Sequence, residues 1–364
     1  LDNLALLAAA PQRVRAADSL PEGGDWIIAA PGPGLEACLP DIARMRKEHT
    51  LLALAPAVRA LLAAGILPDL VCTSDGGWAN RLHLAGIRLP SVPLVFSLHA
   101  AAGIARDWAG PLIPLSCGTA LETGLAEGLP CIGETPTVAL FALRVALACR
   151  AERIILAGQD FASLSCKAHA RGYRFEEDLV WRSLRTAPAE KGLARTWQRH
   201  DLMRGSWRAD SKFLMYRDNL LEFARVRQIP LFRIGSSPFL AELPQAGECR
   251  GGGRAGQGRQ ARVSIRHELA ADWNARIADW TAVRGTASRP GSFASGSREW
   301  SAAASALLAD GHLVPLFELG QARSLRRIRL GCDPEPEAGL GHWLARVARR
   351  LGILLNTRAM DADR

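Results

Sequence analysis

The stretch that decides the fold is Asp25-Trp-Ile-Ile-Ala-Ala30, which runs directly into Pro31-Gly32-Pro33-Gly34. A short, continuous and largely apolar run of this kind is typical of a buried strand. Apolar residues then recur at the three-to-four spacing of an amphipathic helix, at Leu35, Leu39, Ile42 and Met45. Pro40 lies within that pattern, so the helix either begins there or bends there. A strand, a glycine-rich turn and a helix in this order form the first unit of an α/β fold.

The alternation of strands and helices continues as far as about Ile234. Similar apolar runs predict five further strands, at 50–54, 68–73, 92–96, 153–157 and 230–234. Helical patterns stand between several of them, at 56–64, 136–149 and 211–227. Because parallel strands need crossover connections, this order favours a Rossmann-like, doubly wound and mostly parallel sheet. In such a sheet the ligand lies beyond the carboxyl ends of the strands.

Four parts of the chain differ in composition. We expect a helical lead-in at 1–24, a nucleotide-binding core at 25–243, a linker at 244–262 and a helical C-terminal region at 263–364. The linker prediction rests on glycines mixed with arginines around Gly251-Gly-Gly253, which offer nothing to bury. Helical patterns beyond it carry no chemical motif, at 264–285, 298–309 and 342–351.

The composition is that of a globular protein, and it favours some classes of binding partner over others. The 364 residues are 48% hydrophobic and 22% charged, and the net charge is +9. Of the 45 basic residues only four are lysines, a bias that a GC-rich genome explains. Arginine also recognises phosphates and carboxylates through its planar fork. The basic residues are spread thinly along the chain, which makes nucleic acid a weak alternative partner.

Neither a membrane span nor a secretion signal is visible in the sequence. The richest apolar stretch, Leu51 to Leu67, is interrupted by Arg59 and falls short of the roughly 20 residues that a membrane helix needs. The eight cysteines stand singly, with no C-x-x-C pair, and are expected to be reduced. The chain begins with Leu1, which indicates a fragment, a processed chain or a different gene start. We therefore expect a cytoplasmic protein, and no metal site can be assigned from the sequence.

Glycines and one aspartate follow the first and third predicted strands. Gly32 and Gly34 would let backbone N–H groups approach a phosphate at a helix start, although tight turns also use glycine for steric reasons alone. Ser74 and Asp75 precede two more glycines. The Asp75 carboxylate suits a ribose hydroxyl, a metal or an acceptor, or else it caps a helix at 78–84. One carboxylate gives little support to a two-metal phosphoryl-transfer site.

The richest polar segment follows the fifth predicted strand. Gln159 and Asp160 can hold sugar or base hydroxyls, and Lys167 can meet a phosphate. His169 is the first candidate for a general acid or base, although a single histidine is more often structural. His99, just past the fourth strand, is a second candidate.

A further loop combines Ser116–Thr119 with Gly133, Thr135 and Thr137. Its hydroxyls and backbone amides can grip a carboxylate or a phosphate without a charge of their own. The same loop starts the helix at 136–149, with the Thr135 hydroxyl as the expected cap and Pro136 at the first helical position.

Four motifs in one order resemble those of bacterial motility accessory factor proteins, over about residues 25–240. They are Gly32-Pro-Gly-Leu-Glu36, Gly65-Ile-x-Pro68-Asp69-Leu-Val-x-x-Ser74-Asp75, Gly133-Glu-Thr-Pro-Thr-Val138 and Arg153-Ile-Ile-Leu-Ala-Gly-Gln-Asp-Phe-Ala162, the last followed by His169-Ala-Arg-Gly172. That group shares a domain with the archaeal 6-hydroxymethylpterin pyrophosphokinases. Motility accessory factors are regarded as flagellin glycosyltransferases, which move a nonulosonic, sialic-acid-like sugar from a CMP donor to Ser or Thr.

The resemblance implies roles for the candidate residues. The catalytic candidates are His169, as the base that deprotonates the acceptor hydroxyl, and Asp160. The donor-binding candidates are Gly32, Gly34, Ser74, Asp75, Gly133, Thr135, Thr137, Gln159 and Lys167. The CMP-sugar is then a substrate, the acceptor is a flagellin-like protein, and no metal is implied.

Two alternatives stay open at the level of sequence. A pyrophosphokinase acting on a pterin-like alcohol would need ATP and Mg²⁺. This chain reads Thr73-Ser74-Asp75-Gly76 where the pyrophosphokinases have Thr-Asp-x-Asp, and the single aspartate favours the glycosyltransferase branch. The other alternative is a non-catalytic member of the fold that binds a partner such as a flagellin-like subunit. The chain departs from the family pattern at Phe161, at Cys166 and beyond Gln260.

Overall fold

The structure, a computed structural model, describes residues 3, 6–7, 10–15, 17–119, 122, 129–198 and 202–246. The predicted C-terminal helices and most of the predicted linker lie outside these residues. The chain divides into two units, one of residues 15–114 and 135–263 and the other of residues 1–14, 115–134 and 264–364. In the described part of the lead-in, residues 11–13 and 17–19 form single 3-10 turns.

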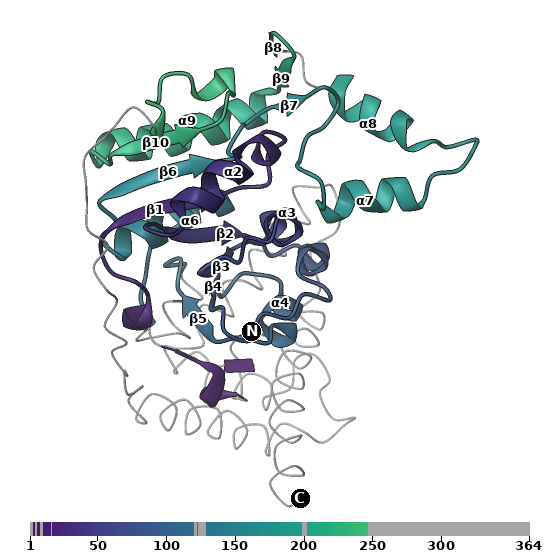
Figure 1. Cartoon of the computed structure of the whole chain (residues 1–364). Helices are drawn as coiled ribbons and strands as arrows, with labels where there is room; N and C mark the ends of the chain where they lie inside the picture. The colour runs from purple at the N-terminus through teal and green to yellow at the C-terminus, as the bar shows by residue number, and fades with distance from the viewer. Residues whose placement is uncertain are drawn as a thin grey trace, which may run out of the picture. The chain divides into compact units, whose positions relative to one another are not determined.

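A seven-stranded parallel sheet carries the fold (Figure 1), in the order β10-β6-β1-β2-β3-β4-β5. Its strands are β1 (Asp25–Ala29), β2 (Thr50–Leu54), β3 (Leu70–Thr73), β4 (Leu94–Ser97), β5 (Leu112–Leu115), β6 (Arg153–Ala157) and β10 (Leu231–Ile234). The predicted doubly wound α/β class is confirmed, and each of the six predicted strands is present. β5 was not predicted, because Pro114 interrupts its short apolar run. Proline is tolerated there because β5 is an edge strand.

The helices lie on both faces of the sheet. They include α2 (Leu35–Met45), α3 (Val58–Ala63), α4 (Ala102–Asp107), α6 (Val138–Ala148) and α9 (Ser211–Val226), with a 3-10 helix η4 at Trp78–His83. α2 packs against α3, and α6 packs against α9. Because the strand order runs in opposite directions from β1, right-handed crossovers place these two pairs on opposite faces.

Two helix starts differ from the expectation. α2 begins at Leu35 and runs through Pro40, so the alternative of a start at Pro40 is wrong. α6 begins at Val138, and its cap is Thr137, whose hydroxyl accepts a hydrogen bond from the Leu140 N–H at 3.1 Å. Thr135 is therefore not the cap of this helix.

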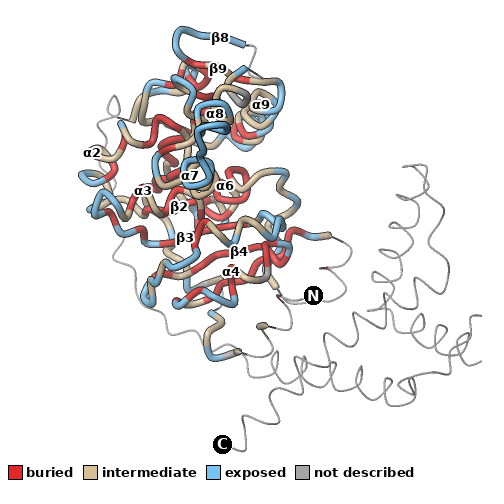
Figure 2. The backbone as a smooth tube through the Cα atoms, turned by 90° about the vertical axis from the view of Figure 1, so that its right-hand side faces the viewer, coloured by how far each residue is buried: buried red, intermediate tan, exposed pale blue. Residues whose placement is uncertain are grey.

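An insertion between β6 and α9 was missed by the sequence patterns. It comprises β7 (Ser163–Leu164), α7 (Arg174–Trp181), α8 (Ala189–Gln198), β8 (Leu202–Arg204) and β9 (Trp207–Ala209). The three strands form a small antiparallel sheet in the order β7-β9-β8. Figure 2 contrasts the buried strands of the main sheet with α7, which has no buried residue. Such an element lacks the continuous apolar pattern that marks the core strands.

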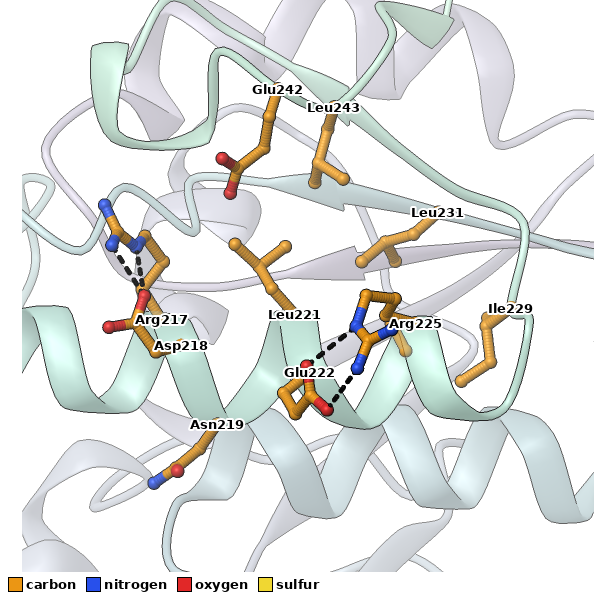
Figure 3. A pocket seen from close by; sticks show the side chains of 11 residues that line it. Arg217, Asp218, Asn219, Leu221, Glu222, Arg225, Ile229, Leu231, Glu242 and Leu243 are labelled. Carbon is orange, nitrogen blue, oxygen red and sulfur yellow. Dashed lines mark hydrogen bonds and ion pairs between the residues drawn. The ribbon is translucent and has the colours of Figure 1, made fainter.

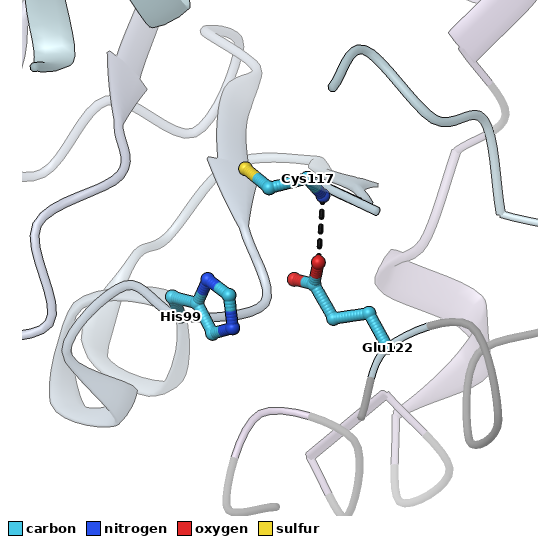
Figure 4. A group of neighbouring side chains, drawn as sticks. All are labelled: His99, Cys117 and Glu122. Atoms are coloured by element: carbon cyan, nitrogen blue, oxygen red, sulfur yellow. Dashed lines mark hydrogen bonds between the residues drawn. The ribbon is translucent and has the colours of Figure 1, made fainter. Parts of the chain in front are cut away.

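The smaller unit is described only in part, around residues 115–119, 122 and 129–134. Ser116 and Cys131 form a parallel bridge there. The buried Glu122 carboxylate accepts a hydrogen bond from the Cys117 N–H at 2.7 Å (Figure 4). Gly133 adopts a φ of 79°, a conformation that favours glycine.

None of the described helices is both long and apolar enough to cross a membrane.

Candidate functional site

The strand order places a topological switch point between β1 and β6. From β1 the chain continues to β2 on one side, whereas β6 and β10 lie on the other. The connections that leave β1 and β6 therefore diverge, and in this class of fold ligands bind at the carboxyl ends of the strands at such a point. Two of the predicted motifs, 30–36 and 158–162, begin at this point.

Asp160 ties the two motifs together from inside the protein. Its carboxylate oxygen Oδ2 accepts a hydrogen bond from the Gly34 N–H at 2.6 Å, at the start of α2. The Gly32 N–H donates to the Gly158 carbonyl at 2.7 Å. A Cβ atom on Gly34 would lie 2.7 Å from Asp160 Oδ1, so glycine is required for this close approach.

Asp160 is buried, with only 4% of the residue exposed. Burial raises its pKa to about 6, although the hydrogen bond from Gly34 acts in the opposite direction. At neutral pH a largely ionised carboxylate therefore lies under the glycine turn. It occupies one of the first amides of α2, the kind of group that would otherwise bind a phosphate.

We call the contact of Asp160 with Gly34 the first clamp. A second clamp joins Glu36 to the segment after β7. The Glu36 carboxylate accepts hydrogen bonds from Lys167 Nζ at 2.6 Å and from the Arg171 N–H at 2.9 Å. Burial alone would raise the pKa of Glu36, but these partners outweigh it and lower the pKa. The Ala170 N–H also donates to the Pro31 carbonyl at 2.8 Å. Lys167, a predicted phosphate ligand, is thus ion-paired within the chain.

His169 is held by two residues of the insertion. Its Nδ1 lies 3.0 Å from Glu176 Oε1, within hydrogen-bond distance. Its ring stacks on Tyr173, with centroids 3.5 Å apart and planes inclined by 3°. The imidazole remains 26% exposed, so it is oriented and still accessible to a substrate.

Asp75, which follows β3, lies close enough to Tyr173 for its charge to act on it. Its exposed carboxylate accepts a hydrogen bond from the Gly77 N–H at 2.9 Å. Burial raises the pKa of Tyr173 to about 12, with smaller contributions from the charges of Glu176 and Asp75. The motifs after β3 and β6 therefore approach each other around Tyr173, although they are far apart in the sequence.

His83, at the end of η4, completes this cluster. It is 3% exposed, and its ring lies 4.9 Å from that of Tyr173 and 4.8 Å from that of Phe175. Burial, together with the nearby His169, lowers its pKa to about 4, so His83 is neutral at physiological pH. Within the described part of the chain, its Nδ1 has no hydrogen-bond partner.

The remaining predicted residues are placed as follows. Gln159 is half-buried, and its Oε1 is a buried acceptor without a hydrogen-bond partner among the residues described. Ser74 is half-buried after β3, and His99 is exposed after β4. Thr135 precedes the Thr137 cap of α6, while Gly133 belongs to the smaller unit.

Backbone strain also gathers at the site. Three non-glycine residues between 161 and 166 have positive φ angles, namely Phe161 at 50°, Ser165 at 47° and Cys166 at 65°. Each such conformation costs on the order of 1–3 kcal/mol and persists where the surroundings enforce it. Strain of this kind is concentrated at functional sites in proteins.

Sequence reasoning missed His83, Tyr173 and Glu176 as members of the site, and it included Glu36 only as the last residue of the Gly32–Glu36 motif, without a role of its own. The only local signal was the spacing of His169, Tyr173 and Glu176, which places a ring and a carboxylate shortly after the histidine. The contacts of Glu36 span 131 and 135 residues and carry no local signal.

A separate pocket of about 770 Å³ lies between α9 and the beginning of β10 (Figure 3). Four of its charged residues form two ion pairs, Arg217 with Asp218 and Arg225 with Glu222. None of the predicted site residues lines it.

Fold and site together define a doubly wound α/β protein with its polar residues at the switch point, the position where this class binds ligands. Residues 2–165 match the family model described as "MptE-like: 6-hydroxymethylpterin diphosphokinase MptE-like". This part of the chain is therefore similar to the MptE-like domain, and the predicted resemblance to the 6-hydroxymethylpterin pyrophosphokinase domain is confirmed over these residues. Lys167, His169 and Glu176 lie just beyond the matched residues.

Among solved structures, the chain is similar to that of the MAf glycosyltransferase from Magnetospirillum magneticum AMB-1. The two share 15% sequence identity with a TM-score of 0.43, and the match covers 76% of this chain and 42% of that chain. The chain thus spans less than half of that protein's length. No curated protein matches the chain by sequence.

Proposed function

We propose that this protein is a nucleotide-sugar-dependent glycosyltransferase. The donor is a CMP-linked nonulosonic sugar, and the acceptor is a Ser or Thr hydroxyl of a cytoplasmic protein such as flagellin. The observation that carries this proposal is the arrangement of His169, an accessible imidazole oriented by Glu176 and Tyr173 beside the carboxyl edge of the sheet. An imidazole held in this way suits the deprotonation of a hydroxyl nucleophile.

The transfer balances with His169 as the base. The acceptor oxygen attacks the anomeric carbon of the sugar and forms the new C–O bond, while its proton passes to Nε2 of His169. The bond between the anomeric carbon and the phosphate oxygen breaks, and CMP leaves with the bonding electron pair. A base of this kind contributes about 10²- to 10⁴-fold to such reactions.

The other candidate residues have binding roles in this proposal. Asp75, Ser74 and the unpartnered Gln159 Oε1 receive the hydroxyls of the ribose or the sugar. The phosphate and carboxylate of the donor are bound by Thr135 and Thr137 at the start of α6, since the Gly32 and Gly34 amides already donate to Gly158 and Asp160. Asp160 acts by holding the glycine turn in place, and Lys167 supplies positive charge for the leaving nucleotide.

The second candidate function is an ATP-dependent diphosphotransferase acting on a pterin-like alcohol. The description of the matching family favours it. It would need Mg²⁺, for which carboxylate oxygens are the usual protein ligands. The turn after β3 offers a single carboxylate, Asp75, which is the reason for ranking this function second.

Isothermal titration separates the two candidates. The full chain is titrated with CMP and CTP, and separately with ATP in the presence of Mg²⁺. The glycosyltransferase proposal predicts binding of the cytidine nucleotides without Mg²⁺. Tight Mg²⁺-dependent binding of ATP, with no binding of CMP, would overturn it, and no nucleotide binding at all would indicate a non-catalytic member of the fold.

A further inference from the structure

We infer that Glu176 and Tyr173 are positioning residues that fix the tautomer and the plane of the His169 imidazole. This inference deepens the proposed function and rests on it in one respect, the use of His169 as the base. Neither residue was singled out by the sequence patterns, and both lie beyond the residues that match the family model.

The tautomer follows from the partner of Nδ1. A carboxylate only accepts hydrogen bonds, so the contact of 3.0 Å between His169 Nδ1 and Glu176 Oε1 requires the proton to be on Nδ1. The neutral ring then carries its lone pair on Nε2, the nitrogen that can take a proton from a hydroxyl. When Nε2 becomes protonated, the new positive charge is formed beside the Glu176 carboxylate.

The plane of the ring follows from the aromatic cluster. Tyr173 lies against His169 with nearly parallel planes, and His83 lies near the other rings of the cluster. Phe175 meets Tyr173 edge to face, with centroids 5.6 Å apart and planes inclined by 86°. Because His83 is buried and neutral, it adds no positive charge next to His169.

Helix α7 carries both of these partners of His169. Tyr173 stands at its N-cap position and Glu176 in its first turn, so a short helical segment delivers both the ring and the carboxylate to His169. Together these two contacts restrict the ring in two ways, since the stack fixes its plane and the hydrogen bond fixes its direction within that plane. Catalytic groups whose side chains are held by packing and hydrogen bonds keep the geometry that proton transfer requires.

The test compares Glu176→Gln with a matched control, Glu177→Gln. Both carboxylates belong to the first turn of α7, but Glu177 faces Arg174 at 3.9 Å rather than His169. The full chain is labelled with ¹⁵N-histidine, and the signals of His169 are assigned with His169→Gln. We expect the Nδ1–H tautomer to predominate in the wild type and in Glu177→Gln, and its share to fall in Glu176→Gln. An unchanged tautomer in Glu176→Gln would overturn the inference.

Kinetics then separate this inference from the proposed function. With a CMP-sugar donor, Glu176→Gln should lower kcat by about 10²-fold or more with little change in the donor KM. Glu177→Gln should keep wild-type kinetics. If the tautomer changes but neither Glu176→Gln nor His169→Gln affects kcat, then the positioning inference holds and the role of His169 as base is wrong. If the tautomer is unchanged while His169→Gln is inactive, the base is right and the positioning inference fails.

Discussion

Asp160 differs from the role predicted for it, because its carboxylate is buried and bonded to the backbone instead of facing a ligand. A carboxylate that accepts the Gly34 N–H from a buried position fixes the start of α2, but its charge is costly to bury. The raised pKa of about 6 expresses this cost. Because the native state holds the proton more tightly than the unfolded chain, the stability from this group is present below pH 3.8 and is lost as pH rises through about 6.

Asp160→Asn should therefore change how stability depends on pH. The amide oxygen can still accept the Gly34 N–H, but no buried charge forms. At pH 7–8 we expect the variant to be more stable than the wild type by on the order of 2–3 kcal/mol, with the difference shrinking toward pH 4. Urea unfolding at several pH values measures this. A difference that does not vary with pH would contradict the assignment.

Gly34 is the partner that allows this contact. A Cβ atom at this position would lie 2.7 and 2.9 Å from the two Asp160 carboxylate oxygens, so Gly34→Ala should destabilise the protein by about 1–3 kcal/mol. The matched control is Gly192→Ala in α8, where the nearest atom would be 3.4 Å away and alanine favours the helix. Chemical denaturation of both variants tests the prediction, and equal stabilities would count against the clamp.

The turn after β7 is strained, because its two central residues adopt a backbone conformation that other residues would adopt more easily. Leu164 and Lys167 exchange two backbone hydrogen bonds, of 2.8 and 2.9 Å, around Ser165 and Cys166. Both central residues have positive φ angles, which defines a type I′ hairpin turn. This turn favours Asn-Gly rather than Ser-Cys.

Cys166→Gly should accordingly stabilise the protein by about 1 kcal/mol, because glycine adopts a positive φ without strain. Cys166→Ala is the control, since it removes the thiol and keeps the strain. Thermal unfolding of the two variants provides the measurement. The strain argument is wrong if alanine stabilises the protein as much as glycine does.

Sequence patterns predicted the elements well where a single local rule applies. The strands at β1 and β6 are continuous apolar runs, and the spacing of Leu35, Leu39, Ile42 and Met45 located α2 despite Pro40. The same patterns missed β5, where a proline interrupts the apolar run, and missed α7 and α8, where exposed residues replace the apolar spacing of a helix.

Sequence patterns predicted only part of the candidate site. Parallel strands end at one edge, which is why the residues after β1, β3 and β6 could be grouped before the structure was known. Which side chain pairs with which could not be predicted. The ion pair of Glu36 with Lys167 and the contact of Asp160 with Gly34 depend on how segments more than 120 residues apart pack.

At the scale of the whole molecule, the two clamps make the motifs after β1 and β6 behave as one unit. Hydrogen–deuterium exchange should therefore show residues 31–36 and 158–171 protected together when CMP is added. Glu36→Gln, which weakens the pair with Lys167, should raise exchange in both segments without ligand, while the exchange of α9 serves as the internal reference. Protection of one segment alone would contradict this coupling.

The proposed chemistry is tested most directly by intact-mass spectrometry of a flagellin-like acceptor incubated with a CMP-linked nonulosonic sugar and the full chain. The account predicts that the acceptor gains the mass of one or more sugar residues, on Ser or Thr, with release of CMP. His169→Gln should lower the rate by about 10²- to 10⁴-fold. Transfer at the wild-type rate by His169→Gln, or release of AMP from ATP and a pterin-like alcohol in place of sugar transfer, would contradict it.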